Sequence, residues 1–419
     1  MSKHESLELQ IDELAGGGAG VARDGEGRVV FVHGAVPGDR VQARITRRRS
    51  SFAEAEILEV LEASSHRRER SCPLADRCGG CPWQHVDYSE QVAAKKSLLE
   101  NAMRRVAEVV SFSAAPAELG YRRRARFTWE RRGRKLTLGF ARWRSRDLVD
   151  VECCPVLVPA LQEALAALRA HLNAWKGEGR GSALLLHGRE GVHLSLRVDQ
   201  GAPPIGPRQD PIVGGMLWRR DRVLQRWGME AVSLDERPLS ASAGAFTQAN
   251  AEQDECLRGW ISEWTGEEPG PILELYGGVG NLTSALAHPE RAVTVVESSP
   301  EAIRWFKKNI GAMEGRVTLM EGEAEGATHM LLAQGASFAG VVLDPPREGA
   351  KEVMASILQL RPGWIIYVSC DPMTLARDLG TLSAGGYAVE ALRGLDMMPQ
   401  STHIEAAALL RLDNTEVAG

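Results

Sequence analysis

The sequence predicts a multidomain protein with a small OB-like β-barrel, an α+β central domain carrying a cysteine cluster, and an α/β domain built on a doubly wound, Rossmann-like sheet. Short strand patterns separated by turns fill residues 1–62, three of the seven cysteines lie within residues 72–81, and the last part of the chain repeats a strand, a loop and a helix. The 419 residues suit two to three domains of about 150 residues each. We place these domains at 1–62, 63–235 and 236–419.

Composition excludes several classes of protein. With 44% hydrophobic and 25% charged residues, the chain resembles an ordinary globular protein. It contains no apolar run of about 18 residues that would mark a membrane span, and its first residues lack the apolar core of a signal peptide. We therefore expect a cytoplasmic protein with no membrane partner, and we expect it to be a monomer.

Basic residues are unevenly distributed along the chain. The net charge is −5, yet residues 40–150 contain 24 Lys and Arg against 14 Asp and Glu, a net of +10 that leaves −15 for the rest. This asymmetry favours a basic face that binds a polyanion such as RNA. A set of solvated surface charges would give the same count, so the alternative stays open at this point.

The first 62 residues read as a small barrel. Apolar and polar residues alternate at 7–11, 41–45 and 53–57, and glycine-rich turns separate the short strands. Several short strands at this spacing are typical of OB-like barrels. We expect the three arginines at 47–49 to lie in a turn, where they would meet phosphate groups.

A cysteine cluster follows the barrel. Cys72, Cys78 and Cys81 are close in sequence, and Cys154 stands before a proline further on. Four thiolates suit either tetrahedral zinc or an iron–sulfur cluster, and three clustered cysteines with a distant fourth favour the cluster. Cys153 competes with Cys154 as the fourth ligand, and coincidental thiols are the plain alternative.

The central part combines a helix with a basic strand. Residues 89–107 form an amphipathic helix pattern with Ser89 as the candidate N-cap. The segment 121–129 interleaves arginines with aromatic residues, which suits RNA because charges meet phosphates and rings stack on unpaired bases. Arg124 and Arg126 are the candidate RNA contacts. In the alternative, the aromatic side of this strand belongs to the core.

The last part alternates strands with helices, which predicts a parallel sheet with helices on both faces. The expected strands are 271–276, 292–296, 317–320, 340–343, 364–367, 387–393 and 405–412. Ligands bind at the carboxyl ends of strands in such sheets. The residues that follow each strand are therefore the candidates for chemistry.

The first two of these strand ends suggest a cofactor. Gly278 and Asn281 lie in a glycine loop after the first strand, and Glu297 ends the second, where a carboxylate grips ribose hydroxyls. The loop lacks the third glycine of Gly-x-Gly-x-x-Gly, which counts against a dinucleotide-dependent oxidoreductase and not against S-adenosylmethionine. A tight βα turn without a ligand is the plain alternative.

Two further strand ends carry reactive groups. Asp344 begins an Asp-Pro-Pro loop that could hold a planar base edge-on, and Cys370 follows a buried strand. Neighbouring strand ends would place both on one wall of a site. From the strand alone, Cys370 is either a nucleophile or a small buried hydrophobe.

Taken together, these motifs resemble the S-adenosylmethionine-dependent RNA 5-methyluridine methyltransferases. The matching elements are FTQAN at 246–250, the glycine loop at 274–281, DPPREG at 344–349, CDP at 370–372 and HIE at 403–405. The N-terminal barrel is similar to a TRAM domain, a small RNA-binding barrel. The resemblance covers nearly the whole chain.

The resemblance implies specific roles. Cys370 would be the nucleophile and Glu405 the proton acceptor, and Asp344, Arg347, Arg124 and Arg126 would bind the RNA. S-adenosylmethionine would be held by Gln248, Tyr276, Gly278, Asn281, Glu297 and Asp344, and a 4Fe–4S cluster by Cys72, Cys78, Cys81 and Cys154. The combination of barrel and cluster is similar to the branch that acts on 23S ribosomal RNA, with transfer RNA as the alternative substrate.

The chain also departs from the family pattern. Glu274, Gly277 and Leu282 replace residues usual in the glycine loop, and Gly277 is expected to make that loop more flexible. A non-catalytic RNA-binding protein with a methyltransferase fold is the rival from another class. That rival would not require Cys370, Glu405, Gln248 and Asp344 all to be present.

Overall fold

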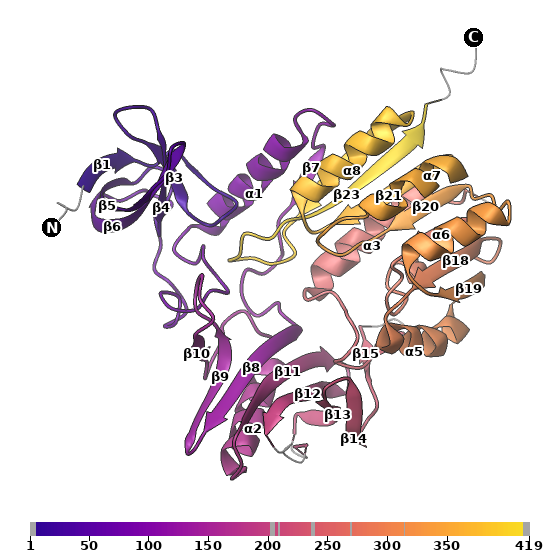
Figure 1. The fold of residues 1–419 in the computed structure, drawn as a ribbon, viewed down its shortest axis with the longest axis horizontal. Helices are drawn as coiled ribbons and strands as arrows, with labels where there is room; N and C mark the ends of the chain where they lie inside the picture. Colours follow the sequence, from indigo (N-terminus) through magenta and orange to yellow (C-terminus); the bar gives the residue numbers. More distant parts are fainter. Residues whose placement is uncertain are drawn as a thin grey trace.

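The computed structural model describes residues 6–201, 206–207, 210–235, 239–268, 270–313 and 315–413. Three large sheets follow one another along the chain (Figure 1). The N-terminal sheet and the C-terminal sheet lie on either side of helix α1 (Tyr88–Met103), and the central sheet lies below them in the view of Figure 1. None of the helices in these ranges is long and apolar enough to cross a membrane.

The N-terminal sheet has the strand order β1-β5-β6-β4-β3-β2, and all of its pairs except β4–β6 are antiparallel. Alternate residues of its strands are buried, as the sequence pattern predicts for a barrel wall. Arg47 and Arg48 end β5 instead of lying in the turn that follows, and both are exposed. The strands are β1 (Ser6–Gln10), β2 (Glu13–Leu14), β3 (Gly20–Arg23), β4 (Val29–His33), β5 (Arg40–Arg48) and β6 (Phe52–Glu62).

The central sheet is covered on one face by helix α2 (Pro159–Ala174). In its strand order, β10-β9-β8-β11-β12-β13-β14, only the β12–β13 pair is parallel. Phe127 and Trp129 of β8 are fully buried against α2, whereas Arg126, which precedes Phe127, points to the other face and is exposed. These two rings therefore belong to the core and are not available for stacking on bases. The strands are β8 (Arg124–Arg132), β9 (Lys135–Ala141), β10 (Leu148–Asp150), β11 (Gly179–Gly188), β12 (Gly191–Gly201), β13 (Ile212–Arg219) and β14 (Arg222–Gly228).

The segment between the barrel and the central sheet packs on the C-terminal sheet. Strand β7 (Ser111–Ser113) pairs in parallel with β22 (Tyr387–Leu395), and Leu99 and Met103 of α1 join the same core as the C-terminal helices. Helix α1 begins one residue earlier than predicted and ends at Met103, so residues 104–107 lie outside it. Its N-cap is Asp87 and not Ser89: the Asp87 side chain accepts a hydrogen bond from the Ser89 backbone N–H.

The C-terminal sheet has the order β19-β18-β17-β20-β21-β23-β22-β7. Strands β17 to β21 are parallel to one another, whereas β23 runs antiparallel to both β21 and β22. The remaining strands are β17 (Ile272–Leu275), β18 (Ala292–Glu297), β19 (Arg316–Glu321), β20 (Gly340–Leu343), β21 (Trp364–Ser369) and β23 (Glu405–Leu412). A small hairpin of β15 (Val232–Leu234) and β16 (Leu239–Ala241) straddles the predicted boundary at 235/236.

Helices cover both faces of this sheet, as the alternating pattern predicts. They are α3 (Ala251–Thr265), α4 (Thr283–Leu286), α5 (Pro300–Asn309), α6 (Ala324–Ala333), α7 (Met354–Leu360) and α8 (Pro372–Ala384), with 3₁₀ turns at Ile310–Ala312 and Lys351–Val353. The strand order reverses at β17, whose neighbours are β18 and β20. A reversal of this kind opens a crevice at the carboxyl ends of the strands.

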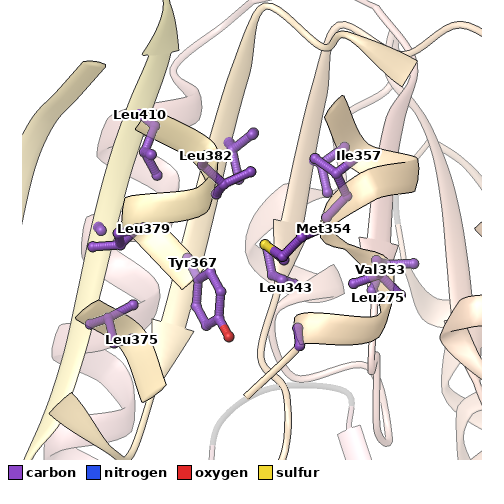
Figure 2. Packing of buried hydrophobic residues seen from close by; sticks show 14 of the residues in the cluster. Leu275, Leu343, Val353, Met354, Ile357, Tyr367, Leu375, Leu379, Leu382 and Leu410 are labelled. Atoms are coloured by element: carbon purple, nitrogen blue, oxygen red, sulfur yellow. The ribbon is translucent and has the colours of Figure 1, made fainter. Parts of the chain in front are cut away.

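One face of the sheet is held by leucine packing (Figure 2). Leu375, Leu379 and Leu382 of α8 recur at helical spacing, and Figure 2 shows them lying toward Tyr367 and Leu410 of the sheet. All five side chains are fully buried. Burial of a leucine side chain stabilises a fold by about 1.5–3 kcal/mol. This packing holds β21, which Cys370 directly follows.

Candidate active site

The pairing of two strands brings Cys370 and Glu405 together. Strand β23 lies antiparallel to β21 with Ser369 opposite Ala406. The next position along this register sets Cys370 opposite Glu405. Glu405 is only 6% exposed, whereas Cys370 is partly exposed. A thiol within reach of solvent therefore lies beside a buried carboxyl group.

Asp344 joins this pair from the neighbouring strand. Leu343 pairs with Tyr367, so Asp344 and Cys370 follow the ends of two adjacent parallel strands. The pKa of the Cys370 thiol is raised to about 11, first by burial and then by the charges of Glu405 and Asp344, whereas Arg347 acts to lower it. The three groups thus lie within electrostatic reach of one another, as their positions at the strand ends predict.

A third carboxyl group, Asp254, was not recognised in the sequence. It lies in the first turn of α3, buried, and accepts hydrogen bonds from Asn281 Nδ2 at 2.7 Å and Arg123 Nη2 at 3.3 Å. Burial first, and then the charge of Asp254, raise the pKa of Asp344 to about 7. Burial and then the charges of Asp344 and Asp254 also hold the pKa of Glu405 well above its ordinary value. A carboxylate in the first turn of a helix is common for reasons of the helix dipole, so it carried no specific signal.

The glycine loop is tied to Glu297. Gly278 has a φ of +58° and its N–H donates to Glu297 Oε2 at 2.8 Å. Glu297 Oε1 accepts two further backbone N–H groups, from Ser298 and Ser299. A carboxylate offers about four acceptor positions, so one remains for a ligand hydroxyl. Tyr276 also has a positive φ, of 63°, and its hydroxyl donates to Glu352 Oε1 at 2.6 Å.

Two departures from the family pattern have structural reasons. A Cβ on Gly277 would lie 2.1 Å from Val295 Cγ1, so a glycine is needed there for space, and its N–H is bonded to Val296 O. The expectation that Gly277 loosens the loop is therefore not supported by its contacts. Glu274 is buried and accepts a hydrogen bond from Thr283 Oγ1 at 2.6 Å, and burial raises its pKa to about 8.

Gln248 lies beside polar atoms that have no partner. Its side chain is buried, and its backbone oxygen accepts a hydrogen bond from Arg123 Nε at 3.0 Å. Thr247 Oγ1 and Asn250 Nδ2 are buried without a hydrogen-bond partner within the described part of the chain. Buried polar groups are normally satisfied, so such orphans mark places where a ligand or water binds.

The candidate RNA-binding arginines differ in their surroundings. Arg124 donates to Ala245 O at 3.2 Å and its guanidinium lies 5.3 Å from the Phe246 ring, so it serves the protein's own packing. Arg126 is exposed. Arg347 is exposed too, although its Nε donates to Asp371 Oδ2 at 3.2 Å. Arg126 and Arg347 therefore remain accessible to a substrate.

The predicted cysteine ligands gather around one cleft. A cleft of about 580 Å³ is lined by Cys78, Cys81 and Cys154 on one side and by His403 on another. Burial raises the pKa of Cys81, and the charges of Cys154 and Cys78 raise it further. The charge of Cys72 likewise raises the pKa values of Cys78 and Cys154. Among the described residues, however, no three His, Cys, Asp or Glu side chains are grouped closely enough to hold a metal ion.

Comparisons with known proteins agree with this arrangement. One family, described as tRNA (Uracil-5-)-methyltransferase, matches residues 229–413, and the TRAM domain matches residues 4–58. The chain is 35% identical to the 23S rRNA (uracil(1939)-C(5))-methyltransferase RlmD of Pseudomonas entomophila, over 96% of this chain and 92% of the relative. This chain belongs to the RNA uracil-C5 methyltransferase family. The expected family, its enzymatic activity and the N-terminal TRAM domain are thereby confirmed.

Other members of the family are similarly related. The Shewanella sediminis RlmD is 32% identical over 97% of this chain and 96% of its own length. Among solved structures, the tRNA (uracil-54, C5)-methyltransferase of Pyrococcus abyssi, in complex with S-adenosyl-L-homocysteine, superposes with a TM-score of 0.74 at 24% identity, covering 96% of this chain and all of that one. At that identity the superposition shows a common fold.

The electrostatic surroundings of Cys370 generate a prediction about its reactivity. Replacing Asp344 by Asn should lower the pKa of the thiol, and replacing Arg347 by Ala should raise it. At pH 9, where Asp344 is ionised, alkylation of Cys370 by iodoacetamide should be faster in Asp344→Asn and slower in Arg347→Ala, each by roughly threefold for half a pKa unit.

Mass spectrometry of the Cys370 peptide measures this rate apart from the other cysteines. Arg134→Ala, which removes an exposed arginine from the turn between β8 and β9, should leave the rate unchanged. Slower alkylation in Asp344→Asn, or faster alkylation in Arg347→Ala, would contradict the electrostatic account.

Proposed function

We propose that this enzyme methylates carbon 5 of a uridine in 23S ribosomal RNA through a covalent bond between Cys370 and carbon 6 of the base, with Glu405 as the proton acceptor. The observation that carries this proposal is the register of β21 and β23, whose last pair, Ser369 with Ala406, directly precedes Cys370 and directly follows Glu405, with Asp344 at the next strand end. A nucleophile and a base at the ends of adjacent strands can both reach one ring bound at this edge of the sheet. The target base must be flipped out or lie in a loop to reach them.

Thiolate addition is the step that activates the base. Carbon 5 of uracil is a poor nucleophile, and adding a thiolate to carbon 6 turns the ring into an enolate that is nucleophilic at carbon 5. The raised pKa of Cys370 keeps the free thiol largely protonated, so Arg347 and the orientation of the thiol against the ring must favour addition. When bound, S-adenosylmethionine supplies the electrophilic methyl group that carbon 5 accepts.

Glu405 then completes the reaction. Its carboxylate takes the proton from carbon 5, the electrons of that bond form the double bond between carbons 5 and 6, and the carbon–sulfur bond breaks to release the Cys370 thiolate. Because its pKa is raised, Glu405 is a stronger base than an ordinary carboxylate once it is ionised. Asp344, with a pKa of about 7, has both protonation states available to hydrogen-bond the uracil edge.

The cofactor would be held between α3 and the glycine loop. The candidate residues are Gln248, Tyr276, Gly278, Asn281, Glu297 and Asp344. Their fit rests on the acceptor position left on Glu297 and on the orphan polar atoms of Thr247 and Asn250 beside Gln248. The Pyrococcus abyssi structure contains S-adenosyl-L-homocysteine, the product of the same donor.

Ribosomal RNA is favoured as the substrate because the relatives named RlmD align over almost their whole length with this chain. Transfer RNA is the second candidate, supported by the name of the Pyrococcus abyssi protein. Arg126 and Arg347, both exposed, would contact the RNA. We retain the division into 1–62, 63–235 and 236–419 as part of the proposal, with residues 88–113 of the middle part packed on the last.

A 4Fe–4S cluster is proposed at Cys72, Cys78, Cys81 and Cys154. Three of these thiols line one cleft, and the fourth, Cys72, lies within electrostatic reach of Cys78 and Cys154, which supports the proposal. Cys154 is favoured over Cys153 because it lines the cleft with Cys78 and Cys81, whereas the exposed Cys153 accepts a hydrogen bond from Gln162.

The catalytic pair makes opposite predictions for two substitutions. Cys370→Ala should abolish methylation while RNA binding persists, because the enolate no longer forms. Glu405→Gln should methylate once and then accumulate a protein–RNA adduct that survives denaturation, because the proton on carbon 5 stays in place. Gel analysis of the denatured reaction measures both, and normal turnover in either variant would refute its assigned role.

The substrate proposal predicts a change in one RNA class. Deleting the gene should remove a single 5-methyluridine from 23S ribosomal RNA and leave transfer RNA unchanged, as mapped by mass spectrometry of nuclease fragments. If 5-methyluridine were lost from transfer RNA alone, transfer RNA and not 23S ribosomal RNA would be the substrate.

The cluster proposal predicts about four iron atoms per chain. Protein purified without oxygen should be brown, and Cys154→Ser should lose iron, whereas Cys153→Ser should keep it. Stoichiometric zinc in a colourless protein would reverse the assignment.

A further inference from the structure

A buried glutamine with a strained backbone lies just before Glu405. Gln400 is fully buried and has a φ of +70°, in the loop of residues 396–404 that joins β22 to β23. Residues with a Cβ rarely adopt this left-handed conformation. Such strain persists only where the surroundings determine it, and it often marks a functional constraint.

The surroundings that hold Gln400 come from a distant part of the chain. Its backbone N–H donates to Gln91 Oε1 at 2.9 Å, and its backbone oxygen accepts from Trp83 N at 3.1 Å. Its side-chain oxygen accepts from Gln91 Nε2 and Arg68 Nη2, both at 3.0 Å, and its Nε2 donates to Glu118 Oε2 at 2.9 Å. Every polar group of Gln400 is thus bonded to residues 68–118.

Helix α1 also contacts the loop through Lys95. Gln91 and Lys95 are both fully buried and lie one helical turn apart, on the same face of α1. Lys95 Nζ donates to Asp396 Oδ1 at 2.6 Å and to Met398 O at 3.1 Å. Figure 1 shows the loop extending from the C-terminal sheet toward the region below α1. The helix therefore holds the loop at 396–398 and at 400.

Hydrogen bonds within the rest of the loop connect its anchored part to β23. Ser401 Oγ donates to Met398 O at 2.7 Å, and the His403 N–H donates to Ser401 Oγ at 3.3 Å. Glu405 follows two residues later as the first residue of β23. The position of Glu405 consequently depends on two sets of contacts. One is the pairing of β23 with β21, and the other is the set of hydrogen bonds from α1 to the 396–404 loop.

We propose that Gln400 and Gln91 are positioning residues for proton removal, acting through the 396–404 loop on Glu405. The inference rests on the proposed role of Glu405 as the proton acceptor. Cys370 is held by β21 and α8; the loop joins the hydrophobic cores of these two elements through Met397 and Ile404, whereas Gln400 and Gln91 belong to neither core. Breaking the glutamine pair should therefore displace the base and leave the nucleophile in place.

The experiment separates methyl transfer from release of the product. Gln91→Ala removes the two hydrogen bonds that the Gln91 side chain makes with Gln400. Gln400→Asn keeps a residue that tolerates the left-handed conformation but shortens the side chain. With S-adenosylmethionine and ribosomal RNA from cells lacking the gene, single-turnover methyl transfer should change by no more than about twofold. Release should slow roughly tenfold to a hundredfold, the scale of a misplaced catalytic group, and the denaturation-resistant adduct should accumulate.

Tyr387→Phe is the matched control. It removes a buried hydrogen bond, from Tyr387 OH to Pro362 O at 2.7 Å, at the opposite end of β22. Its adduct level should equal that of the wild-type protein, and thermal midpoints of all variants report general destabilisation. The double variant Gln91→Ala/Gln400→Asn should resemble the more severe single variant, because paired residues act as a unit.

The outcomes distinguish this inference from the function on which it rests. If Glu405→Gln accumulates adduct and the glutamine variants do not, or if they slow transfer and release equally, the positioning role is overturned. If Glu405→Gln itself accumulates no adduct, the proton-acceptor assignment fails, and the inference fails with it. Adduct in Glu405→Gln and in both glutamine variants, with the control at the wild-type level, supports the inference.

Discussion

The antiparallel pairing of β23 with β21 is the constraint on which the active site depends. Strand β23 runs antiparallel to β21, so the first residues of β23 lie beside the carboxyl end of β21, which Cys370 follows. Side chains alternate between the faces of a sheet, so a slip of one residue in this register would turn Glu405 to the other face. Ala406, Ala407 and Ala408 follow Glu405 in β23 and are all buried. They lie between the helices that cover the two faces of this pair of strands. The proposed chemistry requires a thiol and a carboxylate within reach of one flat ring, and this register brings the two residues to the same edge of the sheet.

The surroundings of the pair set its charge state. Asp254, Asp344 and Glu405 are three carboxyl groups close together, and burial, followed by repulsion between these groups, keeps the pKa values of Asp344 and Glu405 raised. Arg123 of the central part donates to Asp254 and to the backbone of Gln248. The segment between the barrel and the central sheet acts on the same site through α1, where the buried Lys95–Asp396 ion pair holds the loop before Glu405. Removing one partner of a buried pair leaves an uncompensated charge, so this contact is costly to break. The parts that precede the C-terminal sheet therefore also shape the candidate active site.

The sequence was sufficient for the strands of the catalytic sheet and for the residues at their ends. Apolar runs marked β17, β18, β20 and β21, and functional groups in such sheets follow the carboxyl ends of the strands. What could not be predicted depends on contacts between distant residues. Asp254 looked like an ordinary first-turn acid, and Gln91 and Gln400 are more than 300 positions apart, so neither carries a local pattern. The basic strand was ambiguous for the same reason: which of its faces packs against α2 decides that Phe127 and Trp129 are core and that Arg126 is exposed. The sequence pattern predicted Ser89 as the N-cap of α1, and the structure shows Asp87 in that place.

The central claim is that Cys370 forms a covalent bond to carbon 6 of the target uridine. Substrate RNA containing 5-fluorouridine tests it directly, because a base cannot remove fluorine from carbon 5 and the enzyme should stop at the covalent stage. After digestion with protease and nuclease, mass spectrometry should find the modified nucleotide, carrying both fluorine and the transferred methyl group, on the peptide that contains Cys370. A nucleotide attached to a peptide with any of the other cysteines, or RNA that is methylated without any attachment, would contradict the account.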